Sequence, residues 1–275
     1  VKFNFADSLS IDFLQTAKPE EAAKLKESMA QAAELDKARG ALQRQQSDVR
    51  KALRGKPEDA ELLGKDAALK AELAALNAKL KALGGYRLPK THDSNGYASS
   101  TPVSDGQRVF ALFGNGVASG HTLDGQRLWM RLVEPPTHEW GHSASPLLAG
   151  GLLILQIQQL QALDPATGET KWRLPMAQRW GTAAVTRIGT TDVLVTADGQ
   201  VVRATDGKVL AKGLGSLDYN GPLVQDGIAY FMQHGGKAWK LGMLDGDVLT
   251  PTALWTCTPK RDRYYSSPVL LDGLL

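Results

Sequence analysis

The sequence lacks features on which several classes of protein depend. Cys257 is its only cysteine, which rules out an internal disulfide and a zinc cluster built on cysteines. No apolar run approaches the ~20 residues that a membrane-spanning helix needs. The 275 residues carry a formal net charge of only +3, and no segment is basic enough to favour nucleic acid. We therefore expect no transmembrane segment and no nucleic-acid partner.

Aromatic residues are missing from residues 14–85, where the helix-favouring alanine, lysine, glutamate, leucine and glutamine dominate. Pro19 followed by two glutamates suits a first helical turn, and Gly55-Lys56-Pro57 interrupts the helical pattern. The second helix carries leucines at coiled-coil spacing: Leu62, Leu69, Leu73, Leu76, Leu80 and Leu83. The first helix has a poorer stripe: Leu25, Met29, Leu35, Ala38, Leu42, Val49 and Leu53. Residues 18–85 are predicted to form an inserted coiled-coil hairpin, either a solvated arm or a surface that binds a partner or a second copy.

The rest of the chain has the texture of short strands. All six tryptophans and 23 of the 28 glycines follow residue 85. Similar segments begin near residues 102, 146, 183, 222 and 268, and the complete ones lead through a loop into further strands and an aspartate-containing turn. Four strands in about 40 residues are typical of a β-propeller blade. A β-sandwich also spaces its strands evenly, but it does not explain a repeated turn followed by tryptophan.

These repeats predict an all-β fold, a β-propeller of four-stranded antiparallel blades over residues 86–275. The blades are expected at about 98–133, 143–176, 180–214 and 219–257, with the start of another at 264–275. Residues 1–17 alternate apolar and polar side chains and are expected to supply the outer strands of a partial blade. With only four complete blades, we expect an internal piece of a longer propeller rather than a five-bladed ring sealed by residues 1–14.

One blade carries a complete turn motif, Ala162-x-Asp164-x-x-Thr167-Gly168-x-x-x-Trp172. Partial copies occur at residues 123–129 and at Leu244-Asp245-Gly246 with Trp255, and a weaker copy at residues 204–210 has Lys212 near the expected tryptophan position. This motif resembles the tryptophan-docking repeat of pyrroloquinoline-quinone (PQQ)-like β-propellers. The resemblance implies that the indole stacks against the neighbouring blade, so the motif is structural and not a cofactor contact.

The PQQ-like group includes quinoprotein dehydrogenases and the propeller lipoprotein of bacterial outer-membrane protein assembly. Membership would imply a bacterial, periplasmic or otherwise extracytoplasmic location. A dehydrogenase of this group needs PQQ with Ca²⁺, an aspartate base and commonly a pair of adjacent cysteines, which this sequence lacks. Glu134, Glu139 and Asp262 are expected to be isolated, solvated loop acids. We predict no catalytic residue and no bound cofactor, and the PQQ-dependent dehydrogenase stays as the alternative.

The segments that connect one blade to the next are expected to bring side chains together at one mouth of the central channel. These side chains are Asn95, Tyr97, Trp140, His142, Trp180, Tyr219, Asn220, Tyr264 and Tyr265. Tyrosine and tryptophan bury large areas while keeping a polar group, so such a rim suits a protein partner or a small ligand. The alternative is that they fill space between blades. We predict a non-enzymatic scaffold for protein binding or assembly whose ligand face is this rim.

Residues 138–142, with the sequence His-Glu-Trp-Gly-His, match the H-E-x-x-H pattern of zinc hydrolases. That chemistry needs a helix that places both histidines one turn apart, with the glutamate activating a water molecule. Pro135-Pro136 before the pattern and Gly141 within it disfavour a helix. We predict a polar loop without a metal, and a zinc hydrolase is only a remote alternative.

Overall fold

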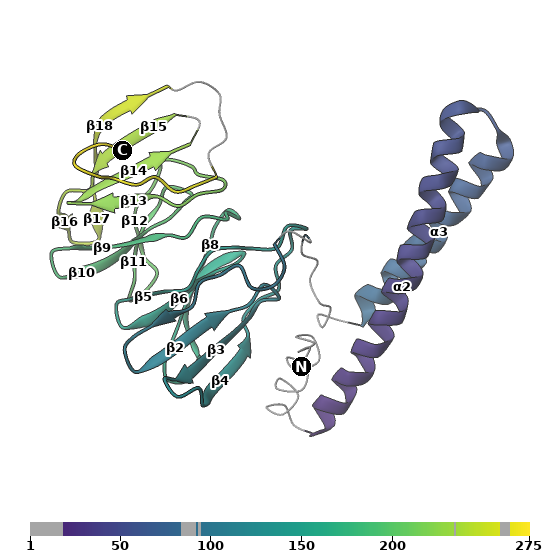
Figure 1. Cartoon of the computed structure of the whole chain (residues 1–275), viewed down its shortest axis with the longest axis horizontal. Helices are drawn as coiled ribbons and strands as arrows, with labels where there is room; N and C mark the ends of the chain where they lie inside the picture. Colours follow the sequence, from purple (N-terminus) through teal and green to yellow (C-terminus); the bar gives the residue numbers. More distant parts are fainter. Residues whose placement is uncertain (1–18, 84–91, 93–94, 234, 259–264) are drawn as a thin grey trace. The chain divides into compact units, whose positions relative to one another are not determined.

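The computed structural model describes residues 19–83, 92, 95–233, 235–258 and 265–275. The chain divides into two compact units, Val1–Leu88 and Pro89–Leu275. The first unit contains the described helices and the second contains the described strands (Figure 1). No helix in the described ranges is long and apolar enough to cross a membrane. The partial blade expected at residues 1–17 lies outside the described residues.

Two long helices form the first unit, α2 (Pro19–Gly55) and α3 (Ala60–Ala82). Asp59 is the N-cap of α3, and its carboxylate accepts hydrogen bonds from two backbone N–H groups of the first turn, at 3.1 and 3.2 Å. The predicted leucine seam of α3 is the less exposed side of the helix. Leu73 and Leu80 are buried, and the other four leucines of the seam are half-buried.

The predicted stripe of α2 is wrong at Ala38, which is exposed. The less exposed positions are instead Ala32, Leu35, Arg39, Leu42, Gln46, Val49 and Leu53. Their spacing alternates between three and four residues, as a coiled-coil seam requires. Two of these positions hold polar side chains, so a search for apolar residues alone misses the register. Leu25 and Met29 of the predicted stripe lie where side chains are not described.

Four antiparallel sheets of four strands make up the described part of the second unit, each in chain order. The first contains β1 (Val103–Ser104), β2 (Arg108–Leu112), β3 (Val117–Thr122) and β4 (Arg127–Leu132). The second contains β5 (Leu147–Ala149), β6 (Leu152–Gln156), β7 (Gln159–Leu163) and β8 (Thr170–Pro175). The third contains β9 (Ala184–Ile188), β10 (Thr191–Val195), β11 (Val201–Arg203) and β12 (Val209–Ala211). The fourth contains β13 (Leu223–Gln225), β14 (Ile228–Met232), β15 (Gly236–Lys240) and β18 (Thr252–Cys257).

This arrangement confirms the predicted fold class, a β-propeller of four-stranded blades with an inserted helical hairpin. The fourth sheet has an addition that the sequence did not predict. Between β15 and β18, β16 (Leu244–Asp245) and β17 (Val248–Leu249) pair as a separate small hairpin. Its tip contains Asp245-Gly246, so this turn does not join the third and fourth strands of the blade, as the partial motif predicted.

The core lies between neighbouring sheets. On β6, Leu153 and Leu155 pack in one buried cluster with Phe110 and Trp129 of the first sheet. Ile154, between them, packs in another cluster with side chains of the third sheet. Successive side chains of a strand point to opposite faces. The second sheet is therefore buried on both faces, as a blade between two others must be.

Indole groups join the first three sheets. Trp129 and Trp172 each donate from Nε1 to a backbone carbonyl of the next sheet, both at 2.9 Å. Each ring also lies against a glycine of that sheet's last turn. A Cβ on Gly168 would lie 2.6 Å from the Trp129 ring, and one on Gly207 would lie 2.7 Å from the Trp172 ring. The turn glycines thus make room for the indole of the preceding blade.

Asp164 shapes the turn that receives Trp129. Its carboxylate accepts backbone hydrogen bonds from Ala166 at 2.8 Å and from Thr167 at 3.1 Å. These bonds, with Ala166 contributing most, hold the pKa of the Asp164 carboxyl below its ordinary value of 3.8. Ala162, fully buried, faces Trp172 across the β7–β8 ladder. The four motif residues therefore hold the blade in shape and in contact with its neighbours.

The joint between the third and fourth sheets differs. Ala211 pairs with Val201 where the complete motif pairs Trp172 with Ala162, so Ala211, and not Lys212, takes the tryptophan position. Charged side chains connect the two sheets instead. Arg203 contacts Asp206 of its own sheet at 2.7 Å and Asp247 of the small hairpin at 2.6 Å, and Lys208 also pairs with Asp247. An ion-pair cluster thus lies where the complete motif has its docked indole, and Trp239 of the fourth sheet donates from Nε1 to the carbonyl of Leu214 at 2.6 Å.

Candidate functional site

The connections between blades are tied together by a repeated hydrogen bond that the sequence analysis did not identify. A backbone N–H of one connection donates to a side-chain hydroxyl at the equivalent position of the next, from Thr101 to Ser145, Ser145 to Thr182 and Gly221 to Ser267, at 3.0, 3.0 and 3.2 Å. Each acceptor directly precedes the start of a first-strand segment, at residues 146, 183 and 268. These bonds fix the preceding residues of each connection next to one another.

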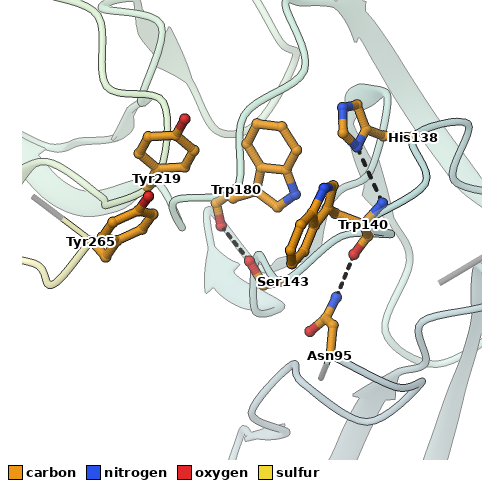
Figure 2. Close-up of a pocket in the computed structure, with 7 residues that line it drawn as sticks. All are labelled: Asn95, His138, Trp140, Ser143, Trp180, Tyr219 and Tyr265. Atoms are coloured by element: carbon orange, nitrogen blue, oxygen red, sulfur yellow. Dashed lines mark hydrogen bonds between the residues drawn. The ribbon is translucent and has the colours of Figure 1, made fainter. Parts of the chain in front are cut away.

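A concavity of about 560 Å³ lies over these connections. Five residues of the predicted rim line it: Asn95, Trp140, Trp180, Tyr219 and Tyr265. Two further lining residues, His138 and Ser143, were not predicted. Figure 2 shows the aromatic rings gathered around this space, from four connections of the chain. Ser143 is neither aromatic nor an amide, so the prediction missed it. It nevertheless occupies the same position before a first strand as Trp180, Tyr219 and Tyr265.

The rings form a row. His138 meets Trp180 edge-on with centroids 4.9 Å apart, Trp180 stacks on Tyr219 at 5.9 Å, and Tyr219 lies 4.7 Å from Tyr265. Trp140 stacks on the ring of His92 at 3.9 Å. Contacts of this kind hold each ring in place before any ligand arrives. The site is therefore an apolar surface with an ordered shape.

Polar contacts to the backbone position these rings. The Asn95 side-chain amide donates to the carbonyl of Trp140 at 2.7 Å, and the Ser143 hydroxyl donates to the carbonyl of Trp180 at 3.0 Å. The backbone N–H of Trp140 donates to Nδ1 of His138 at 3.2 Å (Figure 2). The backbone N–H of Trp180 donates to the backbone carbonyl of Asp218 at 3.1 Å. The placement of both indoles thus depends on bonds that reach across neighbouring connections.

Three predicted rim residues do not line the concavity. Asn220 is buried, and its side-chain amide donates to two backbone carbonyls, at 3.0 and 3.1 Å. Tyr97 is half-buried, and its carbonyl accepts the Gly114 N–H at 2.7 Å. Partial burial raises the pKa of the Tyr97 phenol above 10.0. Tyr264 falls outside the described residues.

His142 is the third predicted rim residue that does not line the concavity. Only 2% of it is exposed, its Nε2 donates to the carbonyl of Phe113 at 3.1 Å, and its Nδ1 has no partner among the described residues. Burial lowers the pKa of the imidazole below 6.5, against the opposing effects of the Phe113 carbonyl and the Glu134 charge. For His142 and Asn220, the space-filling interpretation that competed with binding describes the geometry.

Glu134 was predicted to be an isolated, solvated acid, but its carboxylate is fully engaged in hydrogen bonds. One carboxylate oxygen accepts the backbone N–H groups of Gln158 and Gln159, both at 2.9 Å, and the side-chain amide of Gln161 at 3.2 Å. The other oxygen accepts the side chain of Gln159 at 3.3 Å. Glu134 is therefore not an isolated, solvated acid, but a clamp between the first connection and the β6–β7 turn. Glu139 is exposed, and Asp262 lies outside the described residues.

The H-E-x-x-H segment forms a turn closed by a 2.9 Å hydrogen bond from the Gly141 N–H to the His138 carbonyl. It is not a helix, so the helical spacing that the zinc pattern requires is missing. Within the described ranges, no group of three His, Cys, Asp or Glu side chains could hold a metal. No carboxylate lines the concavity either. Its residues therefore do not fit a quinone held by Ca²⁺.

Comparison with known proteins gives one family. The family model described as outer membrane protein assembly factor BamB matches residues 67–216. A search of the curated proteins found no match. The crystal structure of BamB from Moraxella catarrhalis matches with 16% identity and a TM-score of 0.38, over 48% of this chain and 39% of that one. The computationally designed Ika8 protein matches with 15% identity and a TM-score of 0.43, over 60% of this chain and 50% of that one. The chain thus aligns with half or less of the length of these proteins.

Proposed function

The chain belongs to the family described as outer membrane protein assembly factor BamB, a group of PQQ-like β-propellers, and on that premise we propose that it is a non-enzymatic scaffold for protein binding. The family model covers more than half of the 275 residues. The proposed binding face is the concavity lined by Trp140, Trp180, Tyr219 and Tyr265. By the same membership, we place the protein outside the cytoplasm.

The observation that carries this proposal is the exposure of large rings at a concave, uncharged surface. Trp140 is 46% exposed and Tyr265 is 62% exposed, although the chain buries comparable rings elsewhere. Exposed aromatic side chains in a concavity are typical of sites where a few residues supply most of the binding energy. A small ligand would also fit the volume, but the row of rings extends over several blades, which suits a longer partner.

The enzyme alternative is a PQQ-dependent dehydrogenase. The residues of the concavity do not favour it, because they provide no carboxylate for Ca²⁺. Adding PQQ and Ca²⁺ and following alcohol-dependent dye reduction tests it directly. Sustained turnover would contradict the scaffold proposal.

The scaffold proposal can be tested with a photoreactive amino acid placed at position 265, on the concavity, or at position 128, on β4. Leu128 is 45% exposed and lies away from the concavity lining, so it serves as the control position. In the producing cell, we expect a discrete protein adduct from position 265 and none from position 128.

A substitution then links that adduct to the aromatic surface. Trp140→Ala should abolish the adduct and leave the melting temperature nearly unchanged, because half of the side chain is already exposed. Trp255→Ala removes an indole of similar exposure, 39%, from β18 and should leave the adduct intact. Persistence of the adduct in Trp140→Ala would contradict the proposed face.

A further inference from the structure

We propose that the occupant of the concavity is an extended, proline-rich peptide segment in the polyproline II conformation. This inference rests on the proposed function and names the chemical class of the partner. It follows from three properties of the site: indole donors without a partner among the described residues, an uncharged lining and a row of aromatic rings.

The indole N–H groups divide the tryptophans into two kinds. Those of Trp129, Trp172 and Trp239 donate to backbone carbonyls at 2.9, 2.9 and 2.6 Å. Those of Trp140 and Trp180 make no hydrogen bond within the part of the chain that the structure describes. Figure 2 shows the nitrogen atoms of these two indoles on the edges that face each other. The concavity therefore presents two donors that have no partner among the described residues.

The phenol groups at the other end of the row add to this donor character. Neither Tyr219 nor Tyr265 makes a side-chain hydrogen bond to any described residue. His138 contributes in the same sense. Its Nδ1 accepts the backbone N–H of Trp140 at 3.2 Å. In the neutral ring the proton is therefore on Nε2, which is a donor.

The side-chain acceptors of the concavity are uncharged. They are the oxygen atoms of Asn95, Ser143, Tyr219 and Tyr265, and that of Asn95 already accepts the hydroxyl of Ser99. The lining contains no carboxylate and no lysine or arginine. A fitting ligand is therefore uncharged and offers acceptors to the two indole N–H groups. The partial positive charges of the N–H and O–H groups complement such a ligand.

A polyproline II segment meets these conditions. Its backbone carbonyls have no internal partners, and proline has no N–H that would need an acceptor. Its pyrrolidine rings pack on aromatic side chains, and its limited conformational freedom reduces the entropy lost on binding.

A glycan is the competing ligand, because sugars also stack on aromatic rings. Sugar hydroxyls, however, donate as well as accept, whereas a polyproline segment only accepts, which matches the two indole N–H groups. The two classes can be separated in one titration experiment. Decaproline, a Gly-Ser peptide of the same length and chitohexaose are each titrated into the intact chain and followed by calorimetry. We expect saturable binding of decaproline alone.

Two substitutions test the hydrogen bonds separately from the stacking. Trp140→Phe and Trp180→Phe keep a ring but remove the donor, so each should weaken decaproline binding about three- to tenfold, the effect of one lost hydrogen bond. Trp255→Phe, the same change outside the concavity, should leave the affinity unchanged. All three variants should keep the melting temperature of the unaltered chain.

The outcomes separate this inference from the proposed function. Absence of decaproline binding, equal binding of the Gly-Ser peptide, preference for chitohexaose or full affinity in both phenylalanine variants would each overturn the polyproline assignment. The adduct at position 265 would remain in those cases if the concavity binds a different protein segment. The scaffold proposal itself fails if no adduct forms at position 265, if the adduct survives Trp140→Ala or if PQQ supports turnover.

Discussion

At the scale of single residues, tryptophan serves two purposes in this chain. Trp129 and Trp172 each place the indole N–H on a carbonyl of the next blade and the ring on a glycine, so both ends of the side chain are satisfied. The indole N–H groups of Trp140 and Trp180 lie at a concave surface and have no partner among the residues that the structure describes. The first kind follows a repeated turn motif and can be predicted from the sequence. The second kind has no motif, and only its place between blades predicted it.

The Glu134 clamp gives a prediction about stability. Glu134→Ala leaves two backbone N–H groups of the β6–β7 turn without their partner, at a cost of about 1–3 kcal/mol in the free energy of unfolding. Urea unfolding followed by tryptophan fluorescence measures this. Glu139→Ala, at an exposed acid five residues along, is the control and should change the free energy little. Equal effects would show that the clamp contributes nothing.

His142 gives a prediction about pH. Because burial lowers its pKa in the folded protein, the unfolded chain takes up the proton first as the pH falls below about 6.5. The stability that His142 contributes is present above that pH and is lost as the pH falls toward the folded-state pKa. Urea unfolding at about pH 7.5 and pH 5.5 should show a smaller loss for His142→Gln than for the unaltered chain. Identical losses would contradict the assignment.

At the scale of elements, the docking turn depends on glycine for two separate reasons. Gly168 has a φ of 71°, in the left-handed region, and the Trp129 ring occupies the space of a Cβ. Gly227 has a nearly equal φ of 73°, but nothing lies within 4 Å of its Cβ position. Alanine substitutions at these two glycines therefore separate the cost of backbone strain from the cost of losing indole docking.

We expect Gly227→Ala to cost about 1 kcal/mol, from strain alone. Gly168→Ala should cost about 2–4 kcal/mol, because the added methyl group also displaces the Trp129 ring. Thermal unfolding followed by near-ultraviolet circular dichroism reports both stability and the tryptophan environment. If the two variants unfolded at the same temperature, the docking contact would have no energetic role.

The helical hairpin shows how far an element can be predicted. The seam of α3 follows from its leucines, and only the half-buried Asp66, between Leu62 and Leu69, interrupts them. The seam of α2 does not, because Arg39 and Gln46 occupy it, and Arg39 pairs with Asp36 at 2.7 Å while its side chain is 19% exposed. Long polar side chains can cover an interface with their methylene groups. Their contribution to a seam becomes visible only when the partner helix is in place.

At the scale of the whole molecule, the blades are joined by two different chemistries. Indoles docked on turn glycines connect the first three sheets. The third and fourth are linked by the ion pairs of Arg203, Lys208 and Asp247, beside a buried apolar cluster and the indole bond of Trp239. In a repeat architecture each interface adds its own share to the total stability. Ion pairs are screened by salt and apolar contacts are not. The joint between the third and fourth sheets should therefore be the one that responds to ionic strength.

Asp247→Asn tests this joint. The substitution should lower the melting temperature in low salt, and the difference from the unaltered chain should vanish at about 1 M NaCl, where screening acts within ~3 Å. Asp245→Asn, in the same small hairpin but outside the ion-pair cluster, should have no effect at either salt concentration. A difference that persists at high salt would mean that the ion pairs do not hold the joint.

The sequence by itself determined the repeat, the four-stranded blades and the docking turns, because alternation, turn residues and motif spacing are local properties of the chain. It also placed five of the seven side chains of the concavity, since every connection between blades returns to the same face. The tertiary structure alone decided which side chains of a connection are exposed there. His142 and Ser143 are neighbours in the chain, yet one is buried beneath the Phe113 carbonyl and the other lines the concavity. That choice depends on the adjoining blade, whose backbone supplies the partners and whose position no single segment encodes.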